Sequence, residues 1–191
     1  MRAPFQILVI AFRRTAAGPE FAVPKRSDAQ YWQFVAGGGE EDESPGQAAT
    51  RETKEEIGIA AHDRLLQLDS VATVPKNCFG RGPFRDRGRK RGVGAGPRAR
   101  PDSRAPVPSG GGRHGDLPLQ NADSWGQEVD VIPEHCFAID AGDCALTLSG
   151  EHTEVRWLPY EEACALLKWD SNRKALWELN ERLKKKGSEA Q

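Results

Sequence analysis

Residues 37–59 read GGGEEDESPGQAATRETKEEIGI, a glycine-rich stretch followed by a segment with the start and stop signals of a helix. Ser44 is a favourable N-cap, and Pro45 suits the first helical position because its missing N–H is not needed there. Gly58 is a residue type that commonly ends a helix. The stretch therefore predicts a helix from about Ser44 to Gly58 that directly follows a glycine-rich turn.

Three carboxylates share one face of this predicted helix, because Glu52, Glu55 and Glu56 stand at positions i, i+3 and i+4. Arg51 precedes them and can orient one of them. Grouped carboxylates repel each other unless a positive charge lies among them, and oxygen atoms are the ligands that Mg²⁺ prefers. The charge pattern alone fits a solvated surface as well as it fits a metal site for phosphorus chemistry.

The spacing of these residues resembles the Nudix box, Gly-x5-Glu-x7-Arg-Glu-U-x-Glu-Glu-x-Gly-U, in which U is a large apolar residue. The residues on the required positions are Gly37, Glu43, Arg51, Glu52, Glu55, Glu56, Gly58 and Ile59. Thr53 is the one departure, and we expect it to weaken slightly the packing of the helix on a sheet. With this spacing the chain is identified as a member of the Nudix hydrolase family, and the solvated face becomes the weaker interpretation.

The resemblance also covers most of the chain outside the box, over residues 1–79 and 121–183. It rests on Tyr31-Trp32-Gln33, Glu151-His152, Trp157-Leu158 and Trp169-Asp170-Ser171-Asn172-Arg173. This set resembles the bacterial branch that contains dATP pyrophosphohydrolase, also described as dihydroneopterin triphosphate pyrophosphatase. The resemblance implies an α/β fold, an α/β/α sandwich with a mixed sheet, in one domain at 1–185 followed by a frayed tail at 186–191.

The same resemblance implies metal-dependent hydrolysis of a nucleoside triphosphate-like substrate, such as dATP or dihydroneopterin triphosphate, to a nucleoside monophosphate and pyrophosphate. It implies Mg²⁺ or Mn²⁺ as the cofactor, with Glu55 and Glu56 as ligands. Glu52 is either a third ligand or the base that activates water, and Arg51 orients it. Glu43 stabilises the loop and helix or the outer shell of the metal.

Five residues outside the helix complete the implied site. The resemblance assigns the Ala36 carbonyl and the Glu151 carboxylate to the metal, and Lys25 and Arg26 to the substrate phosphates. Trp32 could stack on a base, although with five tryptophans in the chain core packing is the better interpretation of any single one. Without the resemblance, the glutamate is an ordinary turn residue, the two cations form a solvated strand end, and the tryptophan packs in the core. Within the box, Gly37 and Gly58 are structural positions.

Length and charge limit the classes of function. At 191 residues the chain is expected to form one domain. Ten of its 27 basic residues but only two of its 28 acidic residues lie between Arg81 and Arg113, which leaves 17 basic and 26 acidic residues elsewhere. An acidic body argues against a dedicated nucleic-acid binder, although the basic segment could attract RNA or acidic lipid.

The cysteines and the apolar segments predict a cytoplasmic protein. Cys78, Cys136, Cys144 and Cys164 form no Cys-x-x-Cys pair and no zinc-like spacing, so buried free thiols in a reducing compartment are expected. The apolar run near the N-terminus is short and predicts a first strand rather than a signal peptide. No segment is long and apolar enough to span a membrane.

Hydrophobic patterns predict the order of the elements. We expect strands at 7–12, 21–23, 31–35, 65–74, 129–139, 145–148 and 154–158, and helices at 159–167 and from Asp170 or Ser171 to about Lys185. Pro133 indicates an edge strand or a break in the strand that contains it. The apolar stripe of the last helix consists of Ala175, Leu176, Leu179 and Leu183.

The segment Gly80–Gln120 is predicted to be a disordered insert between two strands. It holds ten of the 20 glycines and six of the 13 prolines and has no Ile, Met, Tyr or Trp, so it cannot bury enough apolar surface to offset its ordering entropy. Four interpretations remain open: a functionless loop, a site for nucleic acid or acidic lipid, a lid, or a stretch read out of frame.

Other functions compete with the preferred one. Within the family, the substrate could be a dinucleoside polyphosphate, a nucleotide sugar or an oxidised nucleotide. A regulatory module that binds a nucleotide without hydrolysing it is a further alternative, but the presence of Glu52, Glu55 and Glu56 favours an enzyme. A protein that binds RNA through the basic segment is a third. The expected partner is a small nucleotide, and the sequence does not predict an oligomeric state.

Overall fold

The computed structural model describes residues 2–61, 64–75 and 129–188. The predicted insert at 80–120, its basic segment at 81–113 and Cys78 lie outside the described residues. The strands are β1 Arg2–Thr15, β2 Gly18–Arg26, β3 Val35–Glu40, β4 Leu65–Pro75, β5 Val131–Asp140 and β6 His152–Leu158. The helices are α1 Pro45–Ile57, α2 Tyr160–Leu166 and α3 Asp170–Ser188.

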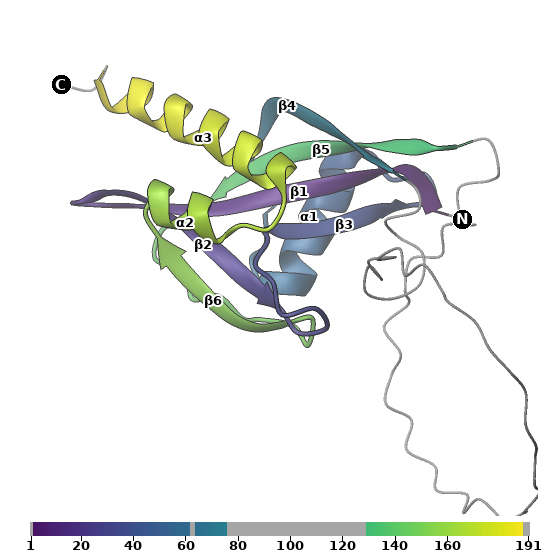
Figure 1. Ribbon diagram of the computed structural model, residues 1–191, viewed down its shortest axis with the longest axis horizontal. Helices are drawn as coiled ribbons and strands as arrows, with labels where there is room; N and C mark the ends of the chain where they lie inside the picture. Colours follow the sequence, from purple (N-terminus) through teal and green to yellow (C-terminus); the bar gives the residue numbers. More distant parts are fainter. Residues whose placement is uncertain (1, 62–63, 76–128, 189–191) are drawn as a thin grey trace, which may run out of the picture.

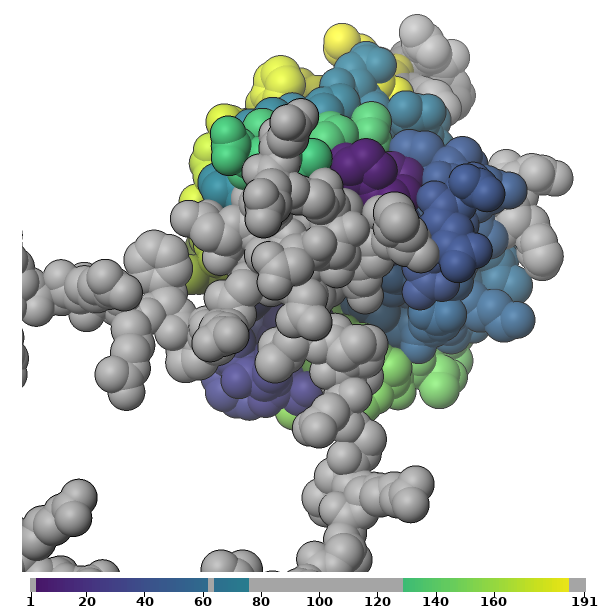
Figure 2. Space-filling model, turned by 90° about the vertical axis from the view of Figure 1, so that its right-hand side faces the viewer, coloured from purple at the N-terminus to yellow at the C-terminus, as the bar shows by residue number. Residues whose placement is uncertain are grey.

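The strands form one mixed sheet in the order β4-β5-β1-β2-β6, and β3 pairs with β1 off this path (Figure 1). β1 is long enough to pair with β3 along its first part and with β2 along its last part. β1 and β5 run parallel, whereas the other pairs are antiparallel. Figure 2 shows the end of the sheet where β1 begins, with β1 between β5 and the blue residues of β3 and α1.

Helices cover both faces of the sheet, so the predicted α/β/α sandwich is confirmed (Figure 1). Alternate residues of β1 point to opposite layers, as the period of a strand requires. Ile7 and Val9 lie in a core with Ala48 and Ala49 of α1. Leu8, Ile10 and Phe12 of β1 lie in a second core against α2 and α3. This core includes the stripe that the sequence predicts, Ala175, Leu176, Leu179 and Leu183.

The signals at both ends of α1 work as the sequence predicts. Ser44 and Gln47 form a capping box, because the Ser44 hydroxyl accepts the Gln47 N–H and the Gln47 side chain accepts the Ser44 N–H. Gly58 ends the helix in the left-handed conformation at φ 76°. Thr53 is fully buried and donates its hydroxyl to the Ala49 carbonyl at 2.6 Å, which satisfies a polar group at an apolar position.

The glycine-rich turn predicted before the helix is wrong, because these residues belong to strand β3 and pair with β1. A strand needs glycine here because there is no room for side chains. A Cβ on Gly37 would lie 2.0 Å from the Glu52 carboxylate, and one on Gly39 would lie 2.2 Å from the Phe5 ring. The predicted strand at 31–35 is correspondingly wrong in extent, since β3 starts only at Val35.

We expect Gly39→Ala to affect mainly stability and Gly37→Ala to affect mainly activity. The Phe5 ring is buried in the core and cannot easily move, so Gly39→Ala should lower the free energy of unfolding by about 1–3 kcal/mol. Gly37→Ala meets the end of a more flexible side chain, so it should displace Glu52 and reduce activity more than stability. Urea unfolding and a hydrolysis assay check both variants. Equal losses of stability would contradict the expectation.

Two strand predictions in the second half need correction. Residues 145–148 form no strand. The chain here instead supplies hydrogen-bond donors to the free carbonyl groups at the end of α1: the N–H groups of Thr147 and Ser149 donate to the carbonyls of Ile57 and Glu56, each at 2.9 Å. The strand with Pro133 is not at an edge, since β5 lies between β4 and β1. The ladder to β1 begins only at the next residue, so it needs no N–H from the proline.

The three described cysteines are free thiols but differ in exposure. Cys136 is buried, as predicted, whereas Cys144 is exposed and Cys164 is half-buried, so the prediction of uniformly buried thiols is wrong. Cys144 follows a turn outside the regular elements, where little apolar surface covers it. Among the helices of the described residues, none combines the length and the hydropathy that a membrane span requires.

Cys136 should resist alkylation in the folded protein. Burial raises the pKa of its thiol to about 12, so the reactive thiolate is scarce at pH 8. We expect iodoacetamide at pH 8 to modify Cys144 within minutes and Cys136 only after denaturation. Peptide mapping by mass spectrometry measures both rates in one sample. Equal rates for the two thiols would contradict the packing of β5 described above.

Candidate active site

Arg51 joins the carboxylates of the box into one hydrogen-bonded group. Its guanidinium donates twice to Glu43, at 2.9 Å each, and once to Glu52 at 2.8 Å. It also donates to Glu55 at 3.3 Å and to the Gly38 carbonyl at 3.0 Å. These contacts tie the loop before α1 to the later turns of the helix and to β3, so the arginine positions three acidic side chains at once.

Glu52 lies in a more buried environment than an ordinary helix carboxylate. Burial raises its pKa to about 7, while Arg51 opposes the rise and the charges of Glu56 and Glu55 add to it. Its side chain lies directly against Gly37, and a Cβ at position 37 would meet the Glu52 carboxylate at 2.0 Å. The carboxylate is therefore oriented by Arg51, and in the absence of another cation it is partly protonated near neutral pH.

Glu56 is nearly inaccessible and contacts His152 from the start of β6. The His152 Nε2 lies 2.6 Å from the Glu56 Oε2, and the two side chains are 0% and 3% exposed. A carboxylate acceptor requires the ring proton on Nε2, so a neutral ring has no proton on Nδ1, which has no hydrogen-bond partner in the described part of the chain. Burial raises the pKa of Glu56, and His152 opposes the rise.

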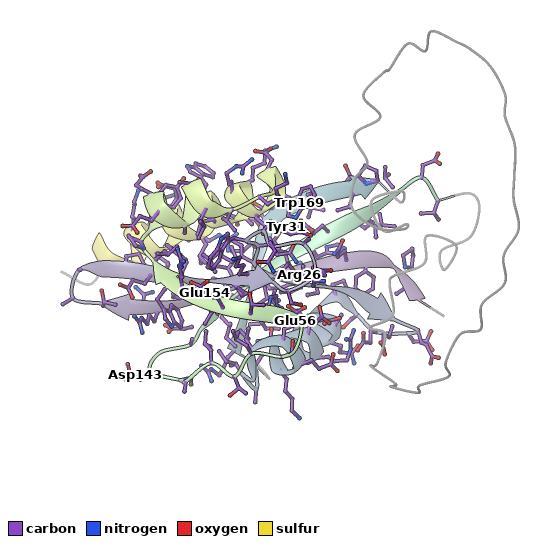
Figure 3. All side chains as sticks on the ribbon, turned by 60° about the horizontal axis from the view of Figure 1, so that its bottom comes forward. Arg26, Tyr31, Glu56, Asp143, Glu154 and Trp169 are labelled. Atoms are coloured by element: carbon purple, nitrogen blue, oxygen red, sulfur yellow. The ribbon has the colours of Figure 1, made fainter. Side chains whose placement is uncertain are left out.

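The loop before β6 brings Glu151 to the same region. Its carboxylate accepts a hydrogen bond from Arg26 at 2.7 Å, and Arg26 also pairs with Asp28. The loop is fixed to the end of β2, because the Ser27 N–H donates to the Glu151 carbonyl and the Ser27 hydroxyl to the Gly150 carbonyl. Figure 3 shows Arg26 next to Glu56, which joins this loop to the acidic face of α1.

Trp32 lies between two cations. The Arg156 guanidinium lies 4.6 Å from its ring centroid and the Lys25 ammonium 5.8 Å. The Trp32 backbone forms isolated β-bridges to Lys25 and to Leu167, and its side chain is half-buried against the core under α2. These contacts hold the tryptophan by cation–π attraction. They leave its role in stacking on a base a prediction.

The structure brings together the acidic residues that the sequence predicts, and it adds His152, for which the sequence supported only a structural role. Glu52, Glu55 and Glu56 share the face of α1, and Glu151 faces them with Arg26. Ala36 precedes Gly37 in β3, the strand that lies against Glu52. Only the adjacent pair Glu151-His152 in the sequence could have indicated the histidine, and pairing with Glu56 across 96 residues is not visible in any local pattern.

The donor set fits a hard divalent cation. All the side-chain donors are carboxylate oxygens. Besides burial, the charges of Glu56 and Glu55 raise the pKa of Glu52, and the charge of Glu151 raises the pKa of Glu56. In the conformation seen, no three acidic, His or Cys side chains of the described residues converge on one point. Each carboxylate is instead turned onto an arginine or histidine, so metal binding would exchange some of these contacts.

Comparison with known proteins decides the family. The NUDIX domain model matches residues 4–93. A crystal structure of a Nudix hydrolase from Listeria monocytogenes is 38% identical, covers 96% of this chain and 97% of that chain, and has a TM-score of 0.68. The chain belongs to the Nudix family. The box predicted from the sequence is therefore the Nudix box of a Nudix fold.

Two further matches are to Escherichia coli proteins named for dihydroneopterin triphosphate. Dihydroneopterin triphosphate diphosphatase of Escherichia coli is 34% identical over 79 residues, which are 41% of this chain and 52% of that protein. The chain thus spans about half the length of the curated relatives that it matches. The structure of the E. coli dihydroneopterin triphosphate pyrophosphohydrolase has a TM-score of 0.62, covering 95% of this chain and 97% of that chain. At 22% identity, this second match shows the fold alone.

Replacing His152 tests whether it supports Glu56. We expect His152→Ala to lower the free energy of unfolding by about 3 kcal/mol, because it leaves a buried carboxylate without its partner. His152→Gln keeps an N–H donor and should recover more than half of the loss. Urea unfolding measures both variants. If alanine and glutamine cost the same, the contact with Glu56 contributes nothing.

Proposed function

We propose that this chain is a metal-dependent pyrophosphohydrolase that cleaves a nucleoside triphosphate-like substrate of the dATP or dihydroneopterin triphosphate type. The products are a nucleoside monophosphate, or its pterin equivalent, and pyrophosphate. The observation that carries the proposal is the group of Glu52, Glu55 and Glu56 on α1, joined by Glu151 from a loop far away in the sequence. Arg51 holds Glu52 and Glu55, and His152 holds Glu56. The Listeria and E. coli relatives support it.

Glu55 and Glu56 would hold Mg²⁺ or Mn²⁺, with Glu151 and the Ala36 carbonyl as further ligands. When bound, such a cation neutralises charge on the phosphoryl oxygens. His152 keeps the buried Glu56 in place, as its 2.6 Å contact indicates. Because Glu55 is 58% exposed and held only at 3.3 Å by Arg51, it can exchange that contact most easily.

Glu52 accepts the proton of the attacking water in this proposal. The fixed distance of 2.8 Å to Arg51 gives its carboxylate one orientation, and Gly37 leaves space for it beside β3. The alternative, in which Glu52 is a third metal ligand, predicts a different result for Glu52→Gln, as described in the Discussion. Glu43 positions Arg51 and accepts the Glu40 N–H at 2.9 Å, so it acts through the loop before α1.

Arg26 and Lys25 would meet the substrate phosphates. Arg26 is part-buried between Glu151 and Asp28, so its charge is already directed toward the acidic site. A bidentate guanidinium suits phosphate oxygens, and the bond to Glu151 can be exchanged when a substrate binds. Trp32 is proposed to lie under the nucleoside, although its two cations and its core contacts also give it a purely structural role.

A non-catalytic nucleotide-binding module is the second candidate. A module that only binds a nucleotide needs no carboxylate positioned to accept a proton from water. Glu52 is held in one orientation by Arg51, as a general base would be. The present residues therefore favour hydrolysis. Within hydrolases, dinucleoside polyphosphates, nucleotide sugars and oxidised nucleotides are alternative substrates, since the box determines the bond that is cleaved more than the group that carries it. The cytoplasmic location, the domain bounds and RNA binding by the basic segment stay predictions.

A product assay tests the proposal. The full chain is incubated with Mg²⁺ or Mn²⁺ and, separately, dihydroneopterin triphosphate, dATP, dGTP, 8-oxo-dGTP, a dinucleoside tetraphosphate and a nucleotide sugar. We expect pyrophosphate and a monophosphate from one or more of the simple triphosphates, and no reaction with EDTA. Cleavage of only the dinucleoside or sugar substrates would move the assignment within the family. Tight nucleotide binding without cleavage would favour the regulatory module.

A further inference from the structure

Glu134 is a buried carboxyl group that the proposed chemistry does not use. It lies in β5, is 5% exposed and has an Oε1 without a hydrogen-bond partner among the described residues. The Ser171 side chain lies near the same carboxyl group and lowers its pKa, although burial raises it more. An unpartnered buried oxygen of this kind is costly, and most buried polar groups in proteins have partners. It therefore indicates a donor that arrives with a ligand.

The carboxyl group faces the layer of α2 and α3. Side chains of β5 alternate between the two faces of the sheet, and Cys136 and Ala138 lie in the core under these helices. Glu134 has the same parity, and its contact with Ser171 places it at the first turn of α3. Burial raises the pKa of Glu134, which is the direction expected for a carboxyl group short of donors.

Polar and aromatic side chains surround this turn of α3. The Asn172 Oδ1 accepts the Phe34 N–H at 3.0 Å, and the Trp169 Nε1 donates to the Gln33 Oε1 at 3.1 Å. Trp169 is 43% exposed, and its ring meets the Tyr31 ring edge to face with the ring centroids 5.6 Å apart. Both residues are labelled in Figure 3. An exposed indole two residues before Ser171, together with a buried carboxyl group near Ser171, is a combination that suits a flat heterocycle with N–H donors.

The sheet connects this carboxyl group to the proposed phosphate site. Gln6 of β1 pairs with Glu134 on one side and with Gly38 of β3 on the other. The Gly38 carbonyl accepts a hydrogen bond from Arg51 of the acidic group. Two strand spacings, about 10 Å, therefore separate Glu134 from β3. A sugar or a short polyol chain between a heterocycle and its phosphates can span this distance.

We propose that Glu134 is a specificity-determining residue that accepts hydrogen bonds from the adjacent ring N–H and 2-amino groups of the substrate's heterocycle. Guanine and a 2-amino-4-oxopteridine both present this pair of donors on one edge. Adenine presents an amino group next to a ring nitrogen that accepts, and this nitrogen would face the carboxyl oxygen unfavourably. The inference rests on the proposed function and selects, within it, the class of heterocycle.

The test compares substrates that differ only at this edge. In Glu134→Gln one carboxyl oxygen becomes an N–H₂ donor. We expect kcat/KM for dGTP and dihydroneopterin triphosphate to fall about 10- to 100-fold, mainly through KM, while kcat/KM for dATP changes less than about threefold. Glu178→Gln is the matched control: Glu178 is a second carboxylate on the α3 side, with Ser70 and Arg182 as partners. The control should leave the ratio of the substrates unchanged.

Binding separates this inference from the proposed hydrolysis. Calorimetry with α,β-methylene dGTP measures affinity without turnover, and Glu134→Gln should weaken it about 10- to 100-fold. If the wild type cleaves no triphosphate but shows this loss of affinity, the proposed function fails and the role of Glu134 stands. An equal effect on dATP and dGTP, an unchanged affinity, or no binding of the analogue by the wild type would overturn the role of Glu134.

Discussion

Replacing Glu56 by Gln should lower kcat about 1000-fold and abolish tight binding of Mn²⁺, because the variant loses a negatively charged oxygen from the centre of the proposed metal site. The fold should survive. Glu56 is buried against His152, and an uncharged amide of the same shape is less costly to bury than a carboxylate. Electron paramagnetic resonance measures free Mn²⁺, the hydrolysis assay measures kcat, and thermal unfolding measures stability.

Glu154→Gln is the control for this variant. Glu154 lies in β6 two residues after His152, has a side chain that is 41% exposed, and pairs with Arg156, so its charge is near the site but outside the proposed ligand set. We expect the control to keep wild-type kcat and Mn²⁺ affinity within about threefold, as is usual for an exposed ion pair. A Glu56→Gln enzyme with normal kcat and normal Mn²⁺ dependence would reject Glu56 as a ligand.

Glu52→Gln should lower kcat by about 10²- to 10⁴-fold, the contribution usual for a general base. If Glu52 takes the proton from water, the affinity for Mn²⁺ should stay within about threefold of wild type. If Glu52 is instead a third ligand, kcat and Mn²⁺ affinity should fall together. Measuring both quantities on one preparation therefore separates the two roles. An unchanged kcat would exclude both.

Arg51→Lys helps to interpret this result. Lysine keeps the positive charge, but it cannot reach Glu43, Glu52 and the Gly38 carbonyl simultaneously, as the guanidinium does. A variant with Glu52 present but poorly oriented should show reduced kcat and nearly normal Mn²⁺ binding. Like Glu52→Gln, Arg51→Lys should therefore lower kcat without weakening Mn²⁺ binding, but the loss of kcat should be smaller.

The parts of the fold that depend on local signals could be predicted from the sequence. The capping box, the proline and the glycine that bound α1 act within a few residues of each other, and so does the stripe of α3. The glycines of β3 could not be interpreted correctly in this way. Their reason is the absence of space next to Glu52 and Phe5, which is a property of the packed structure and leaves a turn-like pattern in the sequence.

The candidate site shows the same division. Spacing along one helix was enough to group Glu52, Glu55 and Glu56. The contacts of Glu56 with His152 and of Arg26 with Glu151 join residues 96 and 125 positions apart, so no helical or strand period could indicate them. Residues 145–148 are a similar case: their pattern is that of a strand, but the open carbonyls at the end of α1 take their N–H groups.

Anomalous diffraction from a crystal soaked in Mn²⁺ tests the central assignment most directly. We expect a strong peak between the carboxylates of Glu55 and Glu56, with Glu151 turned toward it and Arg26 released from that carboxylate. The same soak of Glu56→Gln should show no peak at this position. Full Mn²⁺-dependent hydrolysis by a wild-type protein whose only manganese peak lies away from α1 would contradict the assignment.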